Sequence, residues 1–287
     1  MIKTEIYYFS GTGSSLHIAR ELQKRIPGTK VLPIVSFLHQ EYIELQSQTV
    51  GLVFPIYLNS TPIPVREFIR KIRIKSDKFI FAVTTNCGYP GRVDLYLEKL
   101  LKERGKNLDA YYTIKMLSNS PKGLLPSFMI KQNWASTITK EVISSLEKEV
   151  QKELDIISKF IIGEEKNIGK DRPNPESTLY KKLYLLLHSP LQWNAEHTKN
   201  EIGFYIDSTC TGCRICERVC PSNKIKMDTG KPLWQKEVHC YYCYACFNFC
   251  PEQAILVKNY SHKNGRYVYP GVSAIDIAAQ KNRGEIH

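Results

Sequence analysis

The chain has no long hydrophobic run, and only one of its cysteines lies outside two compact groups. Among its 287 residues, the longest apolar segment is broken by Lys181, Lys182 and His188, so it falls short of the ~20 residues that a membrane-spanning helix needs. No secretory signal is visible, because the first three residues (MIK) lead directly into a strand-like run. Eight of the nine cysteines lie in two compact groups, a pattern that does not suggest a secreted disulfide scaffold. We therefore expect a soluble protein of the reducing cytoplasm.

The first 170 residues alternate apolar, β-rich runs with amphipathic helical patterns, and they are long enough for a sizeable core. We expect strands at residues 3–9, 30–34, 49–54, 78–84 and 110–115. We expect helices at residues 14–25, 65–72, 92–104 and 134–160. Continuous apolar strands that alternate with helices favour a parallel sheet covered on both faces. The predicted fold is α/β, with a doubly wound parallel sheet of five strands.

A glycine loop between the first strand and the first helix lacks the residues of two common nucleotide motifs. No lysine follows Gly13, as a Walker loop would require, and Leu16 stands where a dinucleotide fingerprint has its third glycine. Small and hydroxyl residues at a helix N-terminus nevertheless favour anion binding, because main-chain N–H groups and the helix dipole point at the ligand. The residues of this candidate site are Ser10, Gly11, Thr12, Gly13, Ser14 and Ser15.

This loop resembles the flavodoxin phosphate loop, [ST]-x-T-G-x-[ST], with Ser10, Thr12, Gly13 and Ser15 in register. The resemblance implies a flavodoxin-like domain that binds FMN beyond the carboxyl ends of the strands, between two further loops. The first of these loops holds Pro55, Ile56, Tyr57, Leu58 and Asn59, and the second holds Thr85, Asn86, Cys87, Gly88, Tyr89 and Gly91.

Within these loops the aromatic residues allow two interpretations. Tyr57 could stack on or edge the flavin ring, or simply close a strand, and Tyr89 has the same two alternatives. Main-chain N–H groups from Asn86 to Gly88 could reach the polar rim of the ring. We expect Cys87 to be a buried or loop-filling residue without a catalytic role.

The last third of the chain contains the same cysteine pattern twice, C-x2-C-x2-C-x3-C-P. This spacing is the one by which bacterial ferredoxins hold two 4Fe-4S clusters, with the fourth cysteine of each run serving the other cluster. Zinc ribbons and disulfide frameworks also pair cysteines, but neither explains the third cysteine, the fourth and the proline, all repeated. One predicted cluster has the ligands Cys210, Cys213, Cys216 and Cys250, and the other has Cys240, Cys243, Cys246 and Cys220.

These patterns divide the chain into four parts. We expect a flavodoxin-like FMN-binding domain at 1–170, a packed helical connector at 171–200, a small α+β ferredoxin-like domain with two 4Fe-4S clusters at 201–258, and a tail at 259–287 that docks on the body. For the connector, binding to a membrane surface is an alternative. We expect the tail to contain a short helix opened by Ser273, with Asp276 three residues later.

The chain is short of acidic residues. It has 28 Asp and Glu against 40 Lys and Arg, a formal net charge of +12. Two oxidised clusters with their thiolates and a flavin phosphate would lower the total to roughly +6. Since the basic residues are dispersed among acidic ones, we interpret them as a solvated surface that steers acidic redox partners, rather than as a nucleic-acid site.

With both parts considered, the whole chain resembles the flavodoxin-ferredoxin fusion proteins of anaerobic bacteria and archaea. The resemblance implies an electron carrier that relays electrons between two 4Fe-4S clusters and FMN and on to a partner oxidoreductase. One alternative is a flavin-dependent reductase of a small acceptor, in which residues 116–129 form a substrate pocket rather than a cofactor lid. Another is an iron-sulfur redox sensor without flavin. The sequence offers no convincing acid or base beside the ring, so we assign no catalytic residue.

Overall fold

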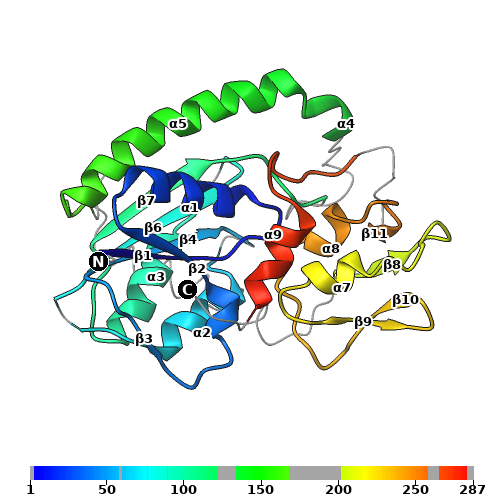
Figure 1. Ribbon diagram of the computed structural model, residues 1–287, viewed down its shortest axis with the longest axis horizontal. Coiled ribbons are helices and arrows are strands. Elements are labelled where there is room, and N and C mark those ends of the chain that lie inside the picture. Colours follow the sequence, from blue (N-terminus) through cyan, green and yellow to red (C-terminus); the bar gives the residue numbers. More distant parts are fainter. Residues whose placement is uncertain are drawn as a thin grey trace.

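The structure is a computed structural model that describes residues 3–57, 60–75, 77–88, 90–121, 134–167, 202–257 and 265–282. In Figure 1 a helix-covered sheet lies on one side and a smaller unit of short strands and helices lies on the other, with helix α9 between them. The strands are β1 (Thr4–Tyr8), β2 (Thr29–Pro33), β3 (Ile43–Glu44), β4 (Thr49–Pro55), β5 (Ile72–Arg73), β6 (Phe79–Asn86), β7 (Ala110–Lys115), β8 (Phe204–Ile206), β9 (Ile225–Asp228), β10 (Lys231–Trp234) and β11 (Ile255–Val257). The helices are α1 (Ser14–Arg25), α2 (Ile63–Lys71), α3 (Val93–Lys102), α4 (Trp134–Thr137), α5 (Lys140–Ile162), α7 (Ile215–Val219), α8 (Ala245–Asn248) and α9 (Ala274–Ala278), with short 3-10 turns η1 (Ile34–Phe37) and η3 (Ala279–Lys281).

The large sheet has five strands in the order β2-β1-β4-β6-β7, and every neighbouring pair is parallel. Counted within the sheet, this order is 2-1-3-4-5, which is the flavodoxin-like order of doubly wound sheets. Helices α1 and α5 cover one face and α2 and α3 cover the other (Figure 1). The predicted fold class is therefore confirmed, and the carboxyl ends of the strands form one edge of the sheet.

Central strands β1, β4 and β6 are buried almost throughout, which explains their continuous apolar sequences. Their side chains pack between the two helical layers, where Ile6, Val53 and Phe81 are fully buried. Each such side chain stabilises the fold by about 1.5–3 kcal/mol through removal of apolar surface from water. This core makes the sheet a rigid support for the loops at its carboxyl edge.

The predicted helix at 134–160 is wrong in one respect, because it is two helices, α4 and α5. Thr139 separates them, with extended backbone and a side-chain oxygen that accepts a hydrogen bond from the Val142 N–H at 3.3 Å. A threonine that caps a helix N-terminus in this way cannot also continue the preceding helix. The short parallel pair β3 and β5 was not predicted either.

In the C-terminal part, β8 pairs with β11 and β9 pairs with β10, all antiparallel, beside the short helices α7 and α8. This is the predicted small α+β unit. The predicted capping box of α9 is confirmed, since Ser273 accepts from the Asp276 N–H while the Asp276 carboxylate accepts from the Ser273 N–H. The predicted connector at 171–200 lies outside the described residues. Among the helices that are described, none is long and apolar enough to cross a membrane.

Candidate functional site

The glycine loop joins β1 to α1 at the carboxyl edge of the sheet. Gly13 adopts a left-handed conformation with φ of 105° directly before the helix, and its N–H donates to Ser10 Oγ at 3.1 Å. The His17 N–H donates to the Gly13 carbonyl at 2.9 Å, which closes the first helical turn. The loop therefore presents the N-terminus of a full-length helix at the sheet edge, the arrangement that favours an anion.

A cavity of about 420 Å³ opens beside this loop, within the size range of small-molecule sites. It is bounded by the loops that follow β1, β4, β6 and β7, because the carboxyl ends of these parallel strands meet at one edge. The lining residues that the sequence singled out are Ser10, Gly11, Thr12, Ser14, Ser15, Pro55, Ile56, Tyr57, Thr85, Asn86 and Cys87.

Some predicted residues do not line the cavity. Gly13, Gly88 and Gly91 do not contribute to the wall, and a Cβ on Gly13 would face Val272 and Tyr269 instead. The Gly88 N–H instead donates to the Asn86 side chain at 2.8 Å. Cys87 is exposed in its loop rather than buried. The predicted site residues Leu58, Asn59 and Tyr89 lie outside the described residues.

Other lining residues were not part of the predicted site. Met116, Leu117, Ser118, Asn119 and Ser120 follow β7, where the sequence had suggested only a lid or a substrate pocket. From the C-terminal part come Ile202, Tyr242 and Tyr244. No local signal in the sequence ties these two tyrosines to the glycine loop, since their neighbours in the chain are cluster cysteines.

The cavity has the polarity that a flavin nucleotide requires. Hydroxyl groups gather at the helix end, where Ser15 Oγ and Thr85 Oγ1 lie 2.9 Å apart. Apolar and aromatic side chains, including Ile56, Tyr57 and Met116, supply the remaining wall for a flat ring. None of the described lining residues is Lys, Arg or His, so a phosphate here would be held by hydroxyl and main-chain N–H groups.

Tyr57 lies at the boundary of this cavity with the cysteine-rich part. Its ring meets the edge of Phe9 at 6.2 Å between centroids, and its hydroxyl accepts a hydrogen bond from Asn119 Nδ2 at 3.3 Å. Burial raises the pKa of Tyr57 well above its usual value, and negative charge at Cys243 raises it further. Tyr57 is therefore a neutral hydroxyl between the cavity and the second cysteine motif.

The eight motif cysteines form two groups, each with three members from one motif and one from the other. Cys210, Cys213, Cys216 and Cys250 line one small cavity. Burial raises the pKa of Cys216 to about 12, and charge on Cys250, Cys213 and Cys210 raises it as well. Burial raises the pKa of Cys246, and the nearby Cys220, Cys243, Cys240 and Cys216 raise it as well. The first predicted ligand set thus lines one cavity, and Cys246 lies near the other three members of the second set and near Cys216 of the first.

Both cysteine loops have the same unusual backbone. Arg214 and Tyr244, at equivalent places in the two motifs, have φ of 65° and 54°. Gly212 and Tyr242 also correspond, with φ of 71° and 56°. Left-handed backbone at a non-glycine residue costs roughly 1–2 kcal/mol, so it persists where the surrounding structure demands it. Here it lets each loop curl so that its cysteines face a common centre.

These sulfur sets fit cubane clusters chemically. Main-chain N–H groups of Tyr242 and Ala254 donate to the sulfurs of Cys240 and Cys250 at 3.4 and 3.3 Å, as cluster-binding loops do to stabilise and tune their thiolates. Buried thiols with raised pKa values lose their protons when they ligate a metal, so cluster binding here would release protons. Within the part of the chain that is described, no group of three or more His, Cys, Asp or Glu forms a site for a single metal ion.

The cavity and the second cysteine group are in direct contact. Asn119 Nδ2 donates to the Cys243 carbonyl at 3.1 Å as well as to Tyr57. Gly11 approaches the same carbonyl so closely that a Cβ on it would lie 2.5 Å from that oxygen. Cys243, a member of the second predicted ligand set, is therefore directly beside the cavity.

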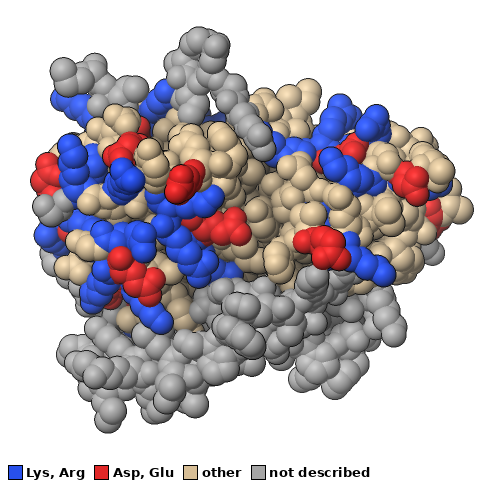
Figure 2. All heavy atoms as spheres, turned by 90° about the horizontal axis from the view of Figure 1, so that it is seen from below, with Lys and Arg blue, Asp and Glu red and all other residues tan. Residues whose placement is uncertain are grey.

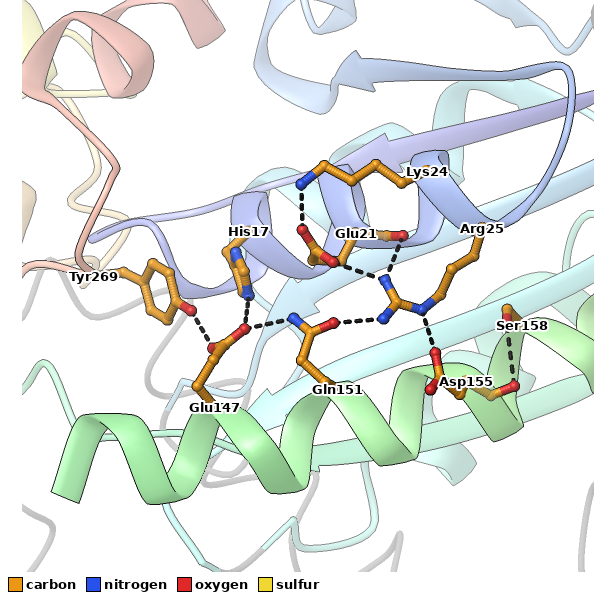
Figure 3. Close-up of polar contacts among 9 residues, drawn as sticks. All are labelled: His17, Glu21, Lys24, Arg25, Glu147, Gln151, Asp155, Ser158 and Tyr269. Atoms are coloured by element: carbon orange, nitrogen blue, oxygen red, sulfur yellow. Dashed lines mark hydrogen bonds and ion pairs between the residues drawn. The ribbon is translucent and has the colours of Figure 1, made fainter. Parts of the chain in front are cut away.

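A polar network ties the glycine-loop helix to α5 and to the C-terminal tail (Figure 3). Glu147 accepts hydrogen bonds from His17 Nε2, Gln151 Nε2 and the Tyr269 hydroxyl, and the His17 and Tyr269 rings stack at 4.3 Å. Burial lowers the pKa of His17, aided by Lys24 and opposed by Glu147 and Glu21. Although burial acts in the opposite direction, these hydrogen bonds lower the pKa of Glu147. The network is therefore a neutral imidazole beside a charged carboxylate.

A family model matches the cysteine-rich part of the chain. Residues 209–255 match the family model of the 4Fe-4S dicluster domain. No curated protein sequence matches the chain significantly.

Among solved structures, the chain is similar to the flavodoxin of Megasphaera elsdenii (17% identity, 41% of this chain and 90% of that one, TM-score 0.30). It is also similar to an FMN-dependent NADH-azoreductase of Bacillus anthracis in complex with FMN (8% identity, 56% and 99%, TM-score 0.36). A third is rubredoxin oxygen:oxidoreductase of Desulfovibrio gigas (14% identity, 57% and 37%, TM-score 0.34). With scores of this size, the fold assignment rests on the strand order of the chain itself. The chain joins a flavodoxin-like α/β fold to a C-terminal 4Fe-4S dicluster domain, an arrangement consistent with the flavodoxin-ferredoxin fusion proteins.

Proposed function

We propose that the protein is an electron carrier that binds FMN in the cavity and two 4Fe-4S clusters on its eight motif cysteines. FMN exchanges one or two electrons and 4Fe-4S clusters exchange one, so together they connect two-electron and one-electron reactions. The single observation that carries the proposal is the contact between the cavity and the Cys243 loop, through Asn119 and Gly11. A flavin held by the cavity would lie next to a cluster ligand.

The same contact suggests an order for the relay. The group with Cys243 adjoins the cavity, while the group with Cys210 includes Cys213, which is exposed. We infer that electrons cross between the flavin site and the Cys243 group, and that they enter or leave the protein at the Cys213 loop.

Charge around this outer group supports a partner with an acidic docking surface. Arg214, in the first cysteine loop, and Lys231, the first residue of β10, are both exposed, and Lys231 Nζ donates to the Cys210 carbonyl at 2.7 Å. On the face drawn in Figure 2, basic side chains are interspersed with acidic ones rather than gathered in one track. Such a surface favours salt-sensitive encounters with a redox protein over binding to a nucleic acid.

The cofactors are tested by anaerobic purification followed by quantification of iron, sulfide and flavin. The proposal expects about eight irons and one FMN per chain. Eight irons with no affinity for FMN would indicate an iron-sulfur sensor instead, and zinc in place of iron would refute the cluster assignment.

Measurements of electron transfer and of catalytic turnover distinguish an electron carrier from an enzyme. The reduced protein should pass electrons to acidic cytochrome b5 faster than to basic cytochrome c, and added salt should slow only the first reaction. Cys213→Ser should slow both transfers but leave FMN bound. Steady-state reduction of quinones, nitro compounds or oxygen with a nicotinamide donor would instead favour the alternative, a flavin-dependent reductase of a small acceptor.

A further inference from the structure

The C-terminal segment from Arg266 to Asn282, called the strap below, runs between the two parts of the molecule. At its start, the Arg266 guanidinium donates to the carbonyls of Phe247, Gln253 and Ile255. Near its end, Lys281 Nζ donates to the Glu217 carbonyl at 3.1 Å. Both ends of the strap are therefore hydrogen-bonded to the cysteine-rich part, and Figure 1 shows α9 beside α7.

Between these ends the strap contacts the glycine loop from behind. Gln280 is fully buried, and its amide bonds both main-chain groups of Ser10: Oε1 accepts from the Ser10 N–H at 3.0 Å and Nε2 donates to the Ser10 carbonyl at 2.9 Å. The Tyr269 N–H donates to the Thr12 carbonyl at 2.8 Å. Two alternate residues of the loop are thus fixed by main-chain hydrogen bonds to the strap.

The loop lies directly against the strap. A Cβ on Gly13 would come within 3.0 Å of side-chain atoms of Tyr269 and Val272, and Gly13 has a left-handed φ as well. On the other side, Ser10, Gly11 and Thr12 line the cavity. The strap therefore backs the loop, while the opposite face of the loop is the wall to which a phosphate would bind.

The buried Gln280 amide, paired with the main chain of Ser10, restricts the conformation of the glycine loop. Since unpaired buried polar groups cost free energy, the Gln280 amide fixes the orientation of the two peptide units on either side of Ser10, one through its N–H and the other through its C=O. The orientation of one peptide determines where the next N–H groups of a tight loop point. Tyr267 is a further strap residue beside the loop: burial raises its pKa to about 12, and a hydrogen bond with the Ser14 side chain opposes this shift.

We propose that Gln280 is a positioning residue for flavin phosphate: it acts through Ser10 to aim the N–H and hydroxyl groups of the glycine loop at the phosphate. This inference rests on the proposed function, since it assumes that the cavity binds FMN. It assigns a role in flavin binding to a residue 270 positions away from the loop that it holds.

Paired ligands test this proposal. Riboflavin has the ring of FMN without the phosphate, so the ratio of the two dissociation constants reports the phosphate site alone. The variant is Gln280→Met, which keeps the volume of the side chain and removes both hydrogen bonds to Ser10. The matched control is Ile275→Ala, because Ile275 belongs to the same strap but is 79% exposed and does not line the cavity. Affinities are measured by flavin fluorescence quenching on anaerobic, cluster-loaded, flavin-depleted protein.

We expect Gln280→Met to weaken FMN about tenfold, as the loss of paired hydrogen bonds implies, with riboflavin unchanged and with an altered ³¹P shift of bound FMN. Ile275→Ala should bind both ligands as the wild type does. An equal loss of both ligands, or no loss of either, overturns the inference. If Gln280→Met does not fold, Gln280→Asn, whose amide is one methylene too short, is measured by the same ratio. Failure of the wild-type protein to bind FMN refutes the proposed function itself, so the two failures are distinguishable.

Discussion

The contact between the glycine loop and the Cys243 loop predicts a strong effect of Gly11→Ala. The new Cβ would lie 2.4 Å from the Tyr57 hydroxyl oxygen and 2.5 Å from the Cys243 carbonyl oxygen, where an ordinary contact starts at 3.4 Å. The two loops must therefore separate by roughly 1 Å. Because the Cys243 carbonyl is a main-chain group in a cysteine loop, it has little freedom to move. Overpacking of this kind costs about 1–3 kcal/mol.

Both cofactor sites share the damaged contact, so the variant should lower the melting temperature by several degrees, weaken FMN about tenfold or more, and lose iron preferentially from the Cys243 group. Anaerobic thermal unfolding, FMN titration and iron analysis with electron paramagnetic resonance measure the three effects. The matched control is Gly163→Ala at the end of α5, where a Cβ meets nothing closer than 3.5 Å and φ is −79°. That variant should be neutral or slightly stabilising. A Gly11→Ala protein with wild-type melting and both cofactors retained would show that the loops do not touch.

Three further predictions follow from single residues. Cys250→Ser should reduce the iron content by about half, because Cys250 lies with Cys210, Cys213 and Cys216. The spectrum of the cluster bound by that group should disappear while that of the cluster bound by the Cys243 group persists. Loss of the cluster of the Cys243 group instead would contradict the crossed assignment. His17→Asn should flatten the dependence of melting temperature on pH. Because the pKa of His17 in the folded state is below its usual value, the folded state loses stability as the pH falls below about 6.5, so the melting temperature of the wild type should drop more between pH 7 and 5 than that of the variant. Parallel plots of melting temperature against pH for the two proteins would contradict this prediction. Ser273→Ala should cost about 1 kcal/mol in anaerobic thermal unfolding, since it removes the cap of α9, and an unchanged melting temperature would show that α9 does not need the cap.

The sequence alone was sufficient for the parts of this protein that depend on short stretches of chain. Five strands and the glycine loop could be predicted because buried parallel strands are continuously apolar and a helix N-terminus with small residues is a local feature. The cluster ligands follow from spacing within eleven-residue motifs, including the exchange of Cys220 and Cys250. The break at Thr139 was missed, because a cap and a mid-helix threonine look alike in sequence.

Only the tertiary structure decided how the two parts meet. Tyr242, Tyr244 and Asn119 join the cavity because the second cysteine loop packs against the carboxyl edge of the sheet. Gln280 reaches Ser10 across 270 positions, and nothing in its local sequence distinguishes it from a surface glutamine. Periodicity and motif spacing describe neighbours along the chain, whereas contacts between distant segments depend on shape and hydrogen-bond pairing that exist only after folding. The residues of each predicted cofactor site could therefore be read from local sequence, whereas the contact between the two sites was set by packing.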